Sequence, residues 1–255
     1  MIATTEAIIL KSLKYRDSSK LLTAYTAEYG RCAFVAHGAR RTKNKFGTAL
    51  EPMSYSILRF YKRPHQELYT LSAAEIAVPM RSLLDSFDRI TAGLAICDTV
   101  YTTQLHEERN PSIFELLKTS LLALNASTSN EQTLLIWFQI QYAALIGFRL
   151  RPTQCAITGE AVAATDSSSF LLSLANGAPY SPRYASAATG FPVDAGTLAV
   201  LQRLSSVEAE HACRIRLSEH QHRQLLDFLT LYYQFHLSRN FSDHSRRFIH
   251  AVQAL

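Results

Sequence analysis

The residues best suited to bind a ligand are the cations of "FVAHGARRTKNKFG", which spans residues 34–47. No Asp or Glu occurs from Arg31 to Leu50, so these cations have no acidic neighbour in the sequence. Like charges held close together repel one another, and a bound polyanion relieves that repulsion. We therefore predict phosphate contacts for the four cations of this stretch, which are Arg40, Arg41, Lys43 and Lys45.

The positive charge of the chain is concentrated in its N-terminal part. The formal net charge is +5, but residues 1–80 hold twelve Lys and Arg against six Asp and Glu, whereas residues 81–255 hold fourteen against fifteen. Such an asymmetry is typical of a protein with a polyanionic partner, and a merely solubilising basic face is the alternative.

Aromatic residues alternate with further cations in this N-terminal part. The runs "KYR" (14–16) and "RFYKR" (59–63) combine phosphate-binding charges with ring faces, which stack on bases that are not locked in a duplex. Most of the rings are expected in the core of the fold, so stacking is predicted for only two of them. The further predicted phosphate contacts are Lys14, Arg16, Lys20, Arg59 and Lys62, and the predicted stacking residues are Tyr15 and Tyr61.

A second basic segment, "DHSRRFIH", lies at residues 243–250. We predict that Arg246 and Arg247 contact either a nucleic acid or a protein partner. A helix C-terminus, where cations interact with the helix dipole, is the alternative explanation.

The sequence contains no motif for catalysis or for nucleotide binding. It has neither G-x-x-x-x-G-K-[ST] nor G-x-G-x-x-G, and no G-x-S-x-G marks a nucleophile. "HEERN" (106–110) begins like a zinc-protease helix but has Asn110 where the second histidine belongs. We interpret it as an exposed helix end with solvated carboxylates. A binding protein without a cofactor is therefore expected, rather than an enzyme.

The first 76 residues, which must position the cations, have the pattern of β-strands. Runs rich in Ile, Leu, Val and aromatic residues are separated by turn residues, and "RPH" (63–65) is a short turn between the last two runs. Five short strands are typical of a small closed barrel, because closure leaves no unpaired edge. We predict an OB-fold barrel, with an SH3-like barrel as the alternative. The predicted strands lie within residues 6–15, 19–31, 31–38, 53–62 and 66–76.

Helical periodicity follows from Pro79 onward, apart from an irregular segment at residues 151–193. Asn110 precedes Pro111 as a predicted N-cap, and an apolar helix is expected to end at Gly147. Two further helices are predicted to begin at Asp194 and at Ser218, where Gln221 completes a capping box. The predicted fold class is α+β, with an OB-fold barrel domain at residues 1–78 and an all-α helical domain at residues 79–255.

Signals for export or membrane insertion are lacking in the sequence. No apolar run is long enough to cross a bilayer, and Glu6 lies where a signal peptide would be apolar. The four cysteines are isolated, so they indicate neither a disulfide framework nor a complete zinc site. A cytoplasmic protein is expected.

Several segments, in the same order along the chain, resemble the RecO family of recombination mediators. "HGARR" (37–41), "LEP" (50–52) and "LYTLSAAE" (68–75) are similar to the N-terminal barrel of that family. In the helical part the similar segments are "NPSIFELL", "ALIGFRL" and "SRRFIH". The resemblance extends thinly over nearly the whole chain.

This resemblance implies a non-enzymatic DNA repair protein whose OB-fold binds single- and double-stranded DNA and anneals complementary strands. It also implies that the protein acts with RecR to help RecA displace the single-strand-binding protein. The helical part would then hold a pocket for the acidic, Phe-ended tail of the single-strand-binding protein. Such a protein would be cytoplasmic and associated with the nucleoid.

One departure from the resemblance concerns zinc. Many members of the family hold zinc with two C-x-x-C pairs, whereas here Cys155 is followed by Thr158, and "YSPR" (180–183) has no cysteine. Zinc takes four ligands, so we predict a metal-free loop, a degenerate form of a zinc site. Its stability would come from the packing of Phe170, Leu171, Leu172 and Tyr180.

Two other functions remain open from the sequence. The alternatives are an adaptor whose basic face binds an acidic protein and an OB-fold protein that binds RNA. Salt dependence and competition between DNA and RNA distinguish these functions.

Overall fold

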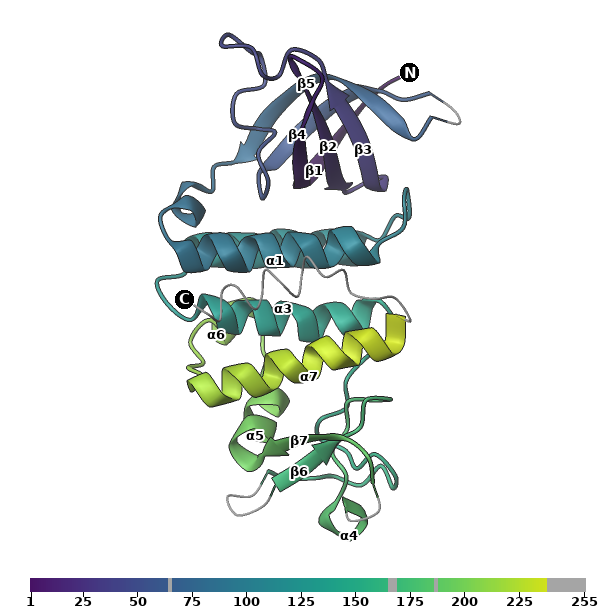
Figure 1. The fold of residues 1–255 in the computed structure, drawn as a ribbon, viewed down its shortest axis with the longest axis vertical. Coiled ribbons are helices and arrows are strands. Elements are labelled where there is room, and N and C mark those ends of the chain that lie inside the picture. Colours follow the sequence, from purple (N-terminus) through teal and green to yellow (C-terminus); the bar gives the residue numbers. More distant parts are fainter. Residues whose placement is uncertain (64–65, 165–168, 186–187, 238–255) are drawn as a thin grey trace. The chain divides into compact units, whose positions relative to one another are not determined.

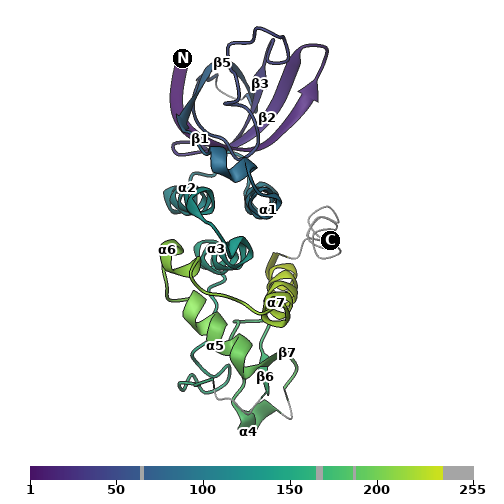
Figure 2. The same ribbon diagram turned by 90° about the vertical axis from the view of Figure 1, so that its left-hand side faces the viewer.

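The computed structural model describes residues 1–63, 66–164, 169–185 and 188–237, and it divides into two compact units. The first unit comprises Met1–Ala126, and the second begins at Ser127. Ribbon diagrams of the chain are drawn in Figures 1 and 2. Arg246 and Arg247 lie outside the described residues, so the prediction for them stays a prediction.

Five strands close into a barrel in the first unit. The sheet order is β1-β2-β3-β5-β4, and β4 is hydrogen-bonded back to β1. β3 and β5 run parallel, whereas every other neighbouring pair is antiparallel. A meander closed by such a crossover is the order of an OB-fold, which confirms the predicted barrel over the SH3-like alternative. The strands are β1 (Ile2–Tyr15), β2 (Ser19–Thr26), β3 (Gly30–Ala36), β4 (Tyr55–Tyr61) and β5 (Leu68–Val78).

Aromatic rings fill the inside of the barrel. The ring centroid of Phe60 lies 5.1 Å from that of Phe34 and 5.2 Å from that of Tyr69, and all three side chains are buried. Successive side chains of a strand point to opposite faces, so Arg59 and Tyr61 are exposed on either side of Phe60 in the chain. The expectation that most rings of the N-terminal part form core is confirmed here.

Two helices and a short 3₁₀ helix complete the first unit. They are η1 (Arg81–Leu84), α1 (Phe87–Thr103) and α2 (Pro111–Ala126). Asn110 Oδ1 accepts hydrogen bonds from the backbone amides of Ser112 (3.1 Å) and Ile113 (3.3 Å), which confirms the predicted N-cap. Both helices lie on the same side of the barrel (Figure 2), and the Phe114 ring of α2 packs 6.3 Å from that of Tyr55 in β4. The last strand of the barrel ends at Val78. A domain division at residues 78–79 remains a prediction.

The segment 104–110 between α1 and α2 packs against the barrel. The Glu107 backbone amide donates to the Arg31 carbonyl (2.9 Å), and the Tyr25 hydroxyl lies 3.4 Å from the Asn110 carbonyl. Glu107 has a positive φ of 57°, which an α-helix cannot contain. The prediction of an exposed helix end at "HEERN" is therefore wrong. Its backbone groups bond to the barrel instead of continuing a helix.

The second unit is mainly helical. The long helices α3 and α7 lie side by side (Figure 1), and the Tyr233 hydroxyl of α7 donates to the Gln139 carbonyl of α3 (2.7 Å). The elements are α3 (Glu131–Leu145), β6 (Ser169–Leu172), α4 (Pro182–Ala185), β7 (Phe191–Asp194), α5 (Ala195–Leu204), α6 (Ala209–Ala212) and α7 (Glu219–Leu237). Among the described helices of both units, none is long and apolar enough to span a membrane.

The helix starts predicted for this unit are confirmed, whereas the segment predicted to be irregular contains two strands. Asp194 Oδ1 accepts from the Thr197 amide (2.7 Å), and Ser218 and Gln221 form the reciprocal bonds of a capping box (3.0 and 3.2 Å). Both predicted caps are confirmed. Within the segment predicted to be irregular, β6 and β7 pair as antiparallel strands. Each of these strands has only four residues, too few to show an alternating pattern.

Substitution of Gly30 tests how closely the 104–110 segment packs on the barrel. The φ of Gly30 is +66°, and a Cβ atom there would collide with the Glu108 carbonyl oxygen. Gly47 also has a positive φ (+53°), but nothing lies within 4 Å of its Cβ position. We expect Gly30→Ala to lower the free energy of unfolding by at least about 3 kcal/mol and Gly47→Ala by only about 1 kcal/mol. Urea unfolding of both variants measures the difference, and equal losses would contradict the packing.

Two histidines of α7 should make stability depend on pH. Burial lowers the pKa of His222, against the opposing effect of the Glu219 charge, and burial likewise lowers the pKa of His236, whose ring lies 4.4 Å from that of Phe148. The unfolded chain then binds protons more readily than the folded chain, so stability is lost as the pH falls below about 6.5. We expect the double variant His222→Gln/His236→Gln to flatten the decline in unfolding free energy between pH 7 and pH 5. The exposed His211→Gln is the control, and an unchanged slope in the double variant would refute the assignment.

Candidate nucleic-acid interface

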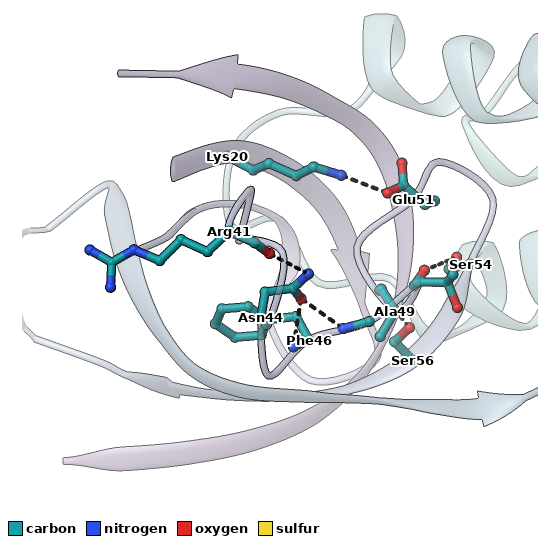
Figure 3. Close-up of polar contacts among 10 residues, drawn as sticks. Lys20, Arg41, Asn44, Phe46, Ala49, Glu51, Ser54 and Ser56 are labelled. Carbon is teal, nitrogen blue, oxygen red and sulfur yellow. Dashed lines mark hydrogen bonds and ion pairs between the residues drawn. The ribbon is translucent and has the colours of Figure 1, made fainter. Parts of the chain in front are cut away.

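The basic loop, which comprises residues 37–54 between β3 and β4, is anchored to the barrel by its apolar residues. Phe46 and Leu50 are buried in the barrel core, at 3% and 1% exposure. Asn44 Oδ1 accepts hydrogen bonds from the backbone amides of Phe46 (3.0 Å) and Gly47 (2.9 Å), and its Nδ2 donates to the Arg41 carbonyl (3.3 Å), as Figure 3 shows. An Asn side chain that bonds nearby backbone groups in this way fixes a turn. The loop therefore holds a defined shape although its cations repel one another.

The basic loop is also bonded to the turn between β1 and β2. The Arg40 backbone amide donates to the Ser18 carbonyl (3.0 Å), and its guanidinium donates to the carbonyls of Arg16 (3.2 Å) and Asp17 (3.1 Å). Just before and after this turn, Lys14 pairs with Lys20 across the two strands. We call this set the loop–turn cluster. Its members are Lys14, Tyr15, Arg16, Lys20, Arg40, Arg41, Lys43 and Lys45.

Most cations of the loop–turn cluster are exposed and unpaired. Among the described residues, no carboxylate forms an ion pair with Lys14, Arg16 or the four cations predicted in the basic loop, and all six are exposed. Lys20 is different, because its Nζ lies 2.6 Å from Glu51 Oε1. Arg16 lies over the half-buried ring of Tyr15, with 5.2 Å between the guanidinium carbon and the ring centroid. The cluster thus presents a concentrated positive charge to solvent.

The other three predicted residues of the barrel lie on or just after β4. Arg59 and Tyr61 are exposed on the outer face, with Tyr61 at 47%. Lys62 is half-buried, with its Nζ 3.2 Å from Glu107 Oε1 and 4.1 Å from the Tyr29 ring centroid. A phosphate at Lys62 would therefore have to displace a carboxylate.

Glu107 is exposed, as predicted for a surface carboxylate, but it is also bonded to the side chains of Lys62 and Tyr69. Burial favours its protonated form, but hydrogen bonds from the Tyr69 hydroxyl and Lys62 outweigh burial and lower its pKa. The segment that packs on the barrel thus carries an anion that neutralises one of the predicted phosphate contacts.

Strand register connects the two groups of predicted residues. Tyr61 pairs with Thr70, Thr70 with Val35, Val35 with Leu21, and Leu21 with Leu13. Neighbouring strands lie about 4.8 Å apart, so this row crosses the outside of the barrel over about 19 Å. Leu13 is 49% exposed at one end of the row and Tyr61 is 47% exposed at the other. The apolar members of the row were missed in the sequence, because alternation gives the face of each strand but not the register between strands.

A pocket of about 470 Å³ also opens in the first unit. It is lined by the end of the β3–β4 loop, by Ile76 and Val78 of β5, and by Leu83 and Leu84 of η1. The walls are mostly apolar, and Glu51 and Arg81 supply charges. An apolar side chain fits such a space.

Comparison with known proteins agrees with this architecture. The family model described as "Recombination protein O N terminal" matches residues 1–80, and that described as "Recombination protein O C terminal" matches residues 84–245. The chain belongs to the RecO family. The resemblance seen in the sequence segments is thereby confirmed.

Individual members of the RecO family are similar over most of their length. The chain is 28% identical over 242 residues to "DNA repair protein RecO" of Chloroherpeton thalassium, covering 93% of each protein. It is 34% identical over 179 residues to the protein of that name from Salinibacter ruber, covering 70% of this chain and 67% of the relative. The corresponding protein of Prosthecochloris aestuarii is 26% identical over 260 residues, covering 99% of this chain and 98% of the relative.

The position of the zinc site implied by the RecO resemblance holds one cysteine, Cys155. Burial favours the neutral thiol of Cys155, but hydrogen bonds from the Ser181 side chain and from the backbone of Thr158 and Ile157 outweigh it and lower the pKa of Cys155 to about 6. Bonds from the Gly159 amide to the Cys155 carbonyl (3.0 Å) and from the Cys155 amide to the Glu160 carbonyl (2.7 Å) close the turn. Within the described ranges, no three His, Cys, Asp or Glu residues lie together where they could hold a metal. This donor set does not fit zinc.

Metal analysis tests the metal-free loop. We expect purified protein to contain far less than one zinc per chain, because a single thiolate with hydroxyl and amide neighbours is a poor zinc ligand set. The unfolding temperature should also be the same with and without EDTA, since no metal contributes to folding. Stoichiometric zinc, or a lower unfolding temperature in EDTA, would contradict this expectation.

Proposed function

We propose that the protein is a non-enzymatic DNA repair protein that binds single- and double-stranded DNA and anneals complementary strands. The observation that carries this proposal is the fixed, unpaired positive charge of the loop–turn cluster. The proposed phosphate contacts are Lys14, Arg16, Lys20, Arg40, Arg41, Lys43, Lys45, Arg59 and Lys62. Tyr15 and Tyr61 are proposed to stack on bases, and Arg246 and Arg247 to form a second contact with DNA or with a partner.

The loop–turn cluster is suited to bind the phosphate backbone rather than base edges. Exposed Lys and Arg neutralise phosphates and release counterions, which gives affinity without sequence preference. Tyr61, at one end of the outward row, offers a ring face to an unpaired base. A surface that neutralises the phosphates of two strands lowers their mutual repulsion, which favours annealing.

Membership of the RecO family supports the proposed partners. We propose that the protein acts with RecR to help load RecA onto DNA coated by the single-strand-binding protein, and that it binds the C-terminal tail of that protein. It would work in the cytoplasm, associated with the nucleoid. The relatives carry the name "DNA repair protein RecO", which agrees with a role in repair.

Fluorescence anisotropy with labelled oligonucleotides at several salt concentrations tests the proposal. Of the nine proposed contacts, about six that neutralise a phosphate at the same time predict a log–log slope near −5 on duplex DNA. Changing Arg40, Arg41, Lys43 and Lys45 together to Ala should weaken binding and annealing and reduce the slope on single strands by about 3, because four phosphate contacts are lost. The thermal stability should change little, since these side chains are exposed and the two hydrogen bonds lost from the Arg40 guanidinium are at the surface.

A matched control removes the same charge from the second unit. Arg183, Arg203, Arg214 and Arg216 are exposed there and form no ion pair with any described carboxylate. Their change to Ala should leave DNA binding close to that of the unmodified chain. Equal effects of the two quadruple variants would mean that net charge, not the cluster, drives binding. Tighter binding of matched RNA, or salt-insensitive binding, would favour one of the two alternative functions.

A further inference from the structure

One cation of the loop–turn cluster already holds an anion. Lys20 Nζ lies 2.6 Å from Glu51 Oε1, and the side chains are 18% and 52% exposed (Figure 3). Lys20 is therefore the more enclosed partner of the pair. The Arg41 guanidinium points away from this pair in the same view.

The backbone around Glu51 is fixed by the barrel rather than by the exposed part of the basic loop. Leu50 and Met53 on either side are buried, at 1% and 5% exposure. The Met53 amide donates to the Ile9 carbonyl of β1 (2.8 Å), and the Ile9 amide donates to the Ser54 carbonyl (3.0 Å). These anchors fix the backbone position of Glu51 beside the loop–turn cluster.

The surroundings explain why an anion is stabilised at this place. Lys20 pairs directly with Lys14 across β1 and β2, and like charges directly opposite each other on a sheet are destabilising. In the adjoining turn, the carbonyls of Arg16 and Asp17 accept hydrogen bonds from the guanidinium of Arg40, which brings a further positive charge to this place. Glu51 offsets part of this positive charge in the protein without DNA.

We propose that Glu51 occupies the phosphate position on Lys20 and competes with DNA for it, so that it limits the affinity of the cluster and its dependence on salt. The inference rests on the function proposed above. While the carboxylate holds Lys20, no backbone phosphate is neutralised there, and a phosphate takes its place only when the carboxylate is released into the solvent. Glu51 is a positioning residue in this scheme, because it acts through Lys20 and not on the DNA.

The size of the effect is bounded by the strength of the ion pair. Partly exposed pairs are weak, and the competition corresponds to about a fivefold change in the binding constant. We expect Glu51→Gln to bind duplex DNA about fivefold more tightly, with a salt slope steeper by about 0.9, since Lys20 then neutralises one more phosphate. Glu75→Gln is the control, because Glu75 is an exposed carboxylate on β5 whose loss changes the net charge equally.

A double-mutant cycle with Lys20→Gln decides whether the gain passes through Lys20. With Lys20 present, Glu51→Gln should tighten binding about fivefold, and with Gln at position 20 the same change should alter it less than about twofold. The same gain in both backgrounds would mean general electrostatic attraction and would overturn the proposal. A gain for Glu75→Gln as large as that for Glu51→Gln would overturn it too.

The outcomes separate this inference from the proposed function. If the unmodified chain does not bind DNA, or binds it without salt dependence, the proposed function fails. If it binds with a steep salt slope that the four loop cations supply, and Glu51→Gln leaves affinity and slope unchanged, only the role of Glu51 fails. Thermal unfolding of each variant shows whether the pair acts on stability instead, in which case Glu51→Gln would lower the unfolding temperature without changing the slope.

Discussion

The basic loop of this protein depends on one constraint, which is that a segment whose charges repel one another must be held by something other than those charges. Phe46 and Leu50 hold the loop because their side chains are buried in the barrel core. Asn44 fixes the turn by accepting hydrogen bonds from the Phe46 and Gly47 amides. Burying a Phe and a Leu side chain contributes a few kcal/mol, more than the repulsion among a few solvated cations costs. The cations can therefore be concentrated without unfolding the loop. Loss of the apolar anchors would release the charges together with the loop.

The barrel also distributes its charges unequally. The β3–β4 loop and the β1–β2 turn carry exposed cations without carboxylate partners among the described residues, whereas Lys62 beside β4 is held by Glu107 from the segment between α1 and α2. Lys20 stands between these two cases, because its partner Glu51 is 52% exposed, more than the 36% of Glu107. Affinity for a polyanion is then set by the number of cations and also by the carboxylates that already occupy them.

Much of the fold could be predicted from local patterns. The strands, the caps at Asn110, Asp194 and Ser218, and the change from strand to helix after Val78 depend on residues close together in the chain, so periodicity and capping rules found them. The pair β6–β7 escaped because strands of four residues carry too little pattern. "HEERN" was misjudged because its backbone bonds to residues such as Arg31 and Tyr25, which are about 75 residues or more away in the chain.

By itself, the sequence determined that the chain forms a small barrel followed by helices, and that its uncompensated positive charge lies near Arg40. These features follow from residue types and from spacings of a few residues, both of which can be read directly from the sequence. Only the tertiary structure decided which cations are free. Lys20 and Lys62 look like the other N-terminal cations in the sequence, but strand register and loop packing place Glu51 and Glu107 against them. An ion pair depends on a distance of a few ångströms between distant positions, and that distance exists only once the chain has folded.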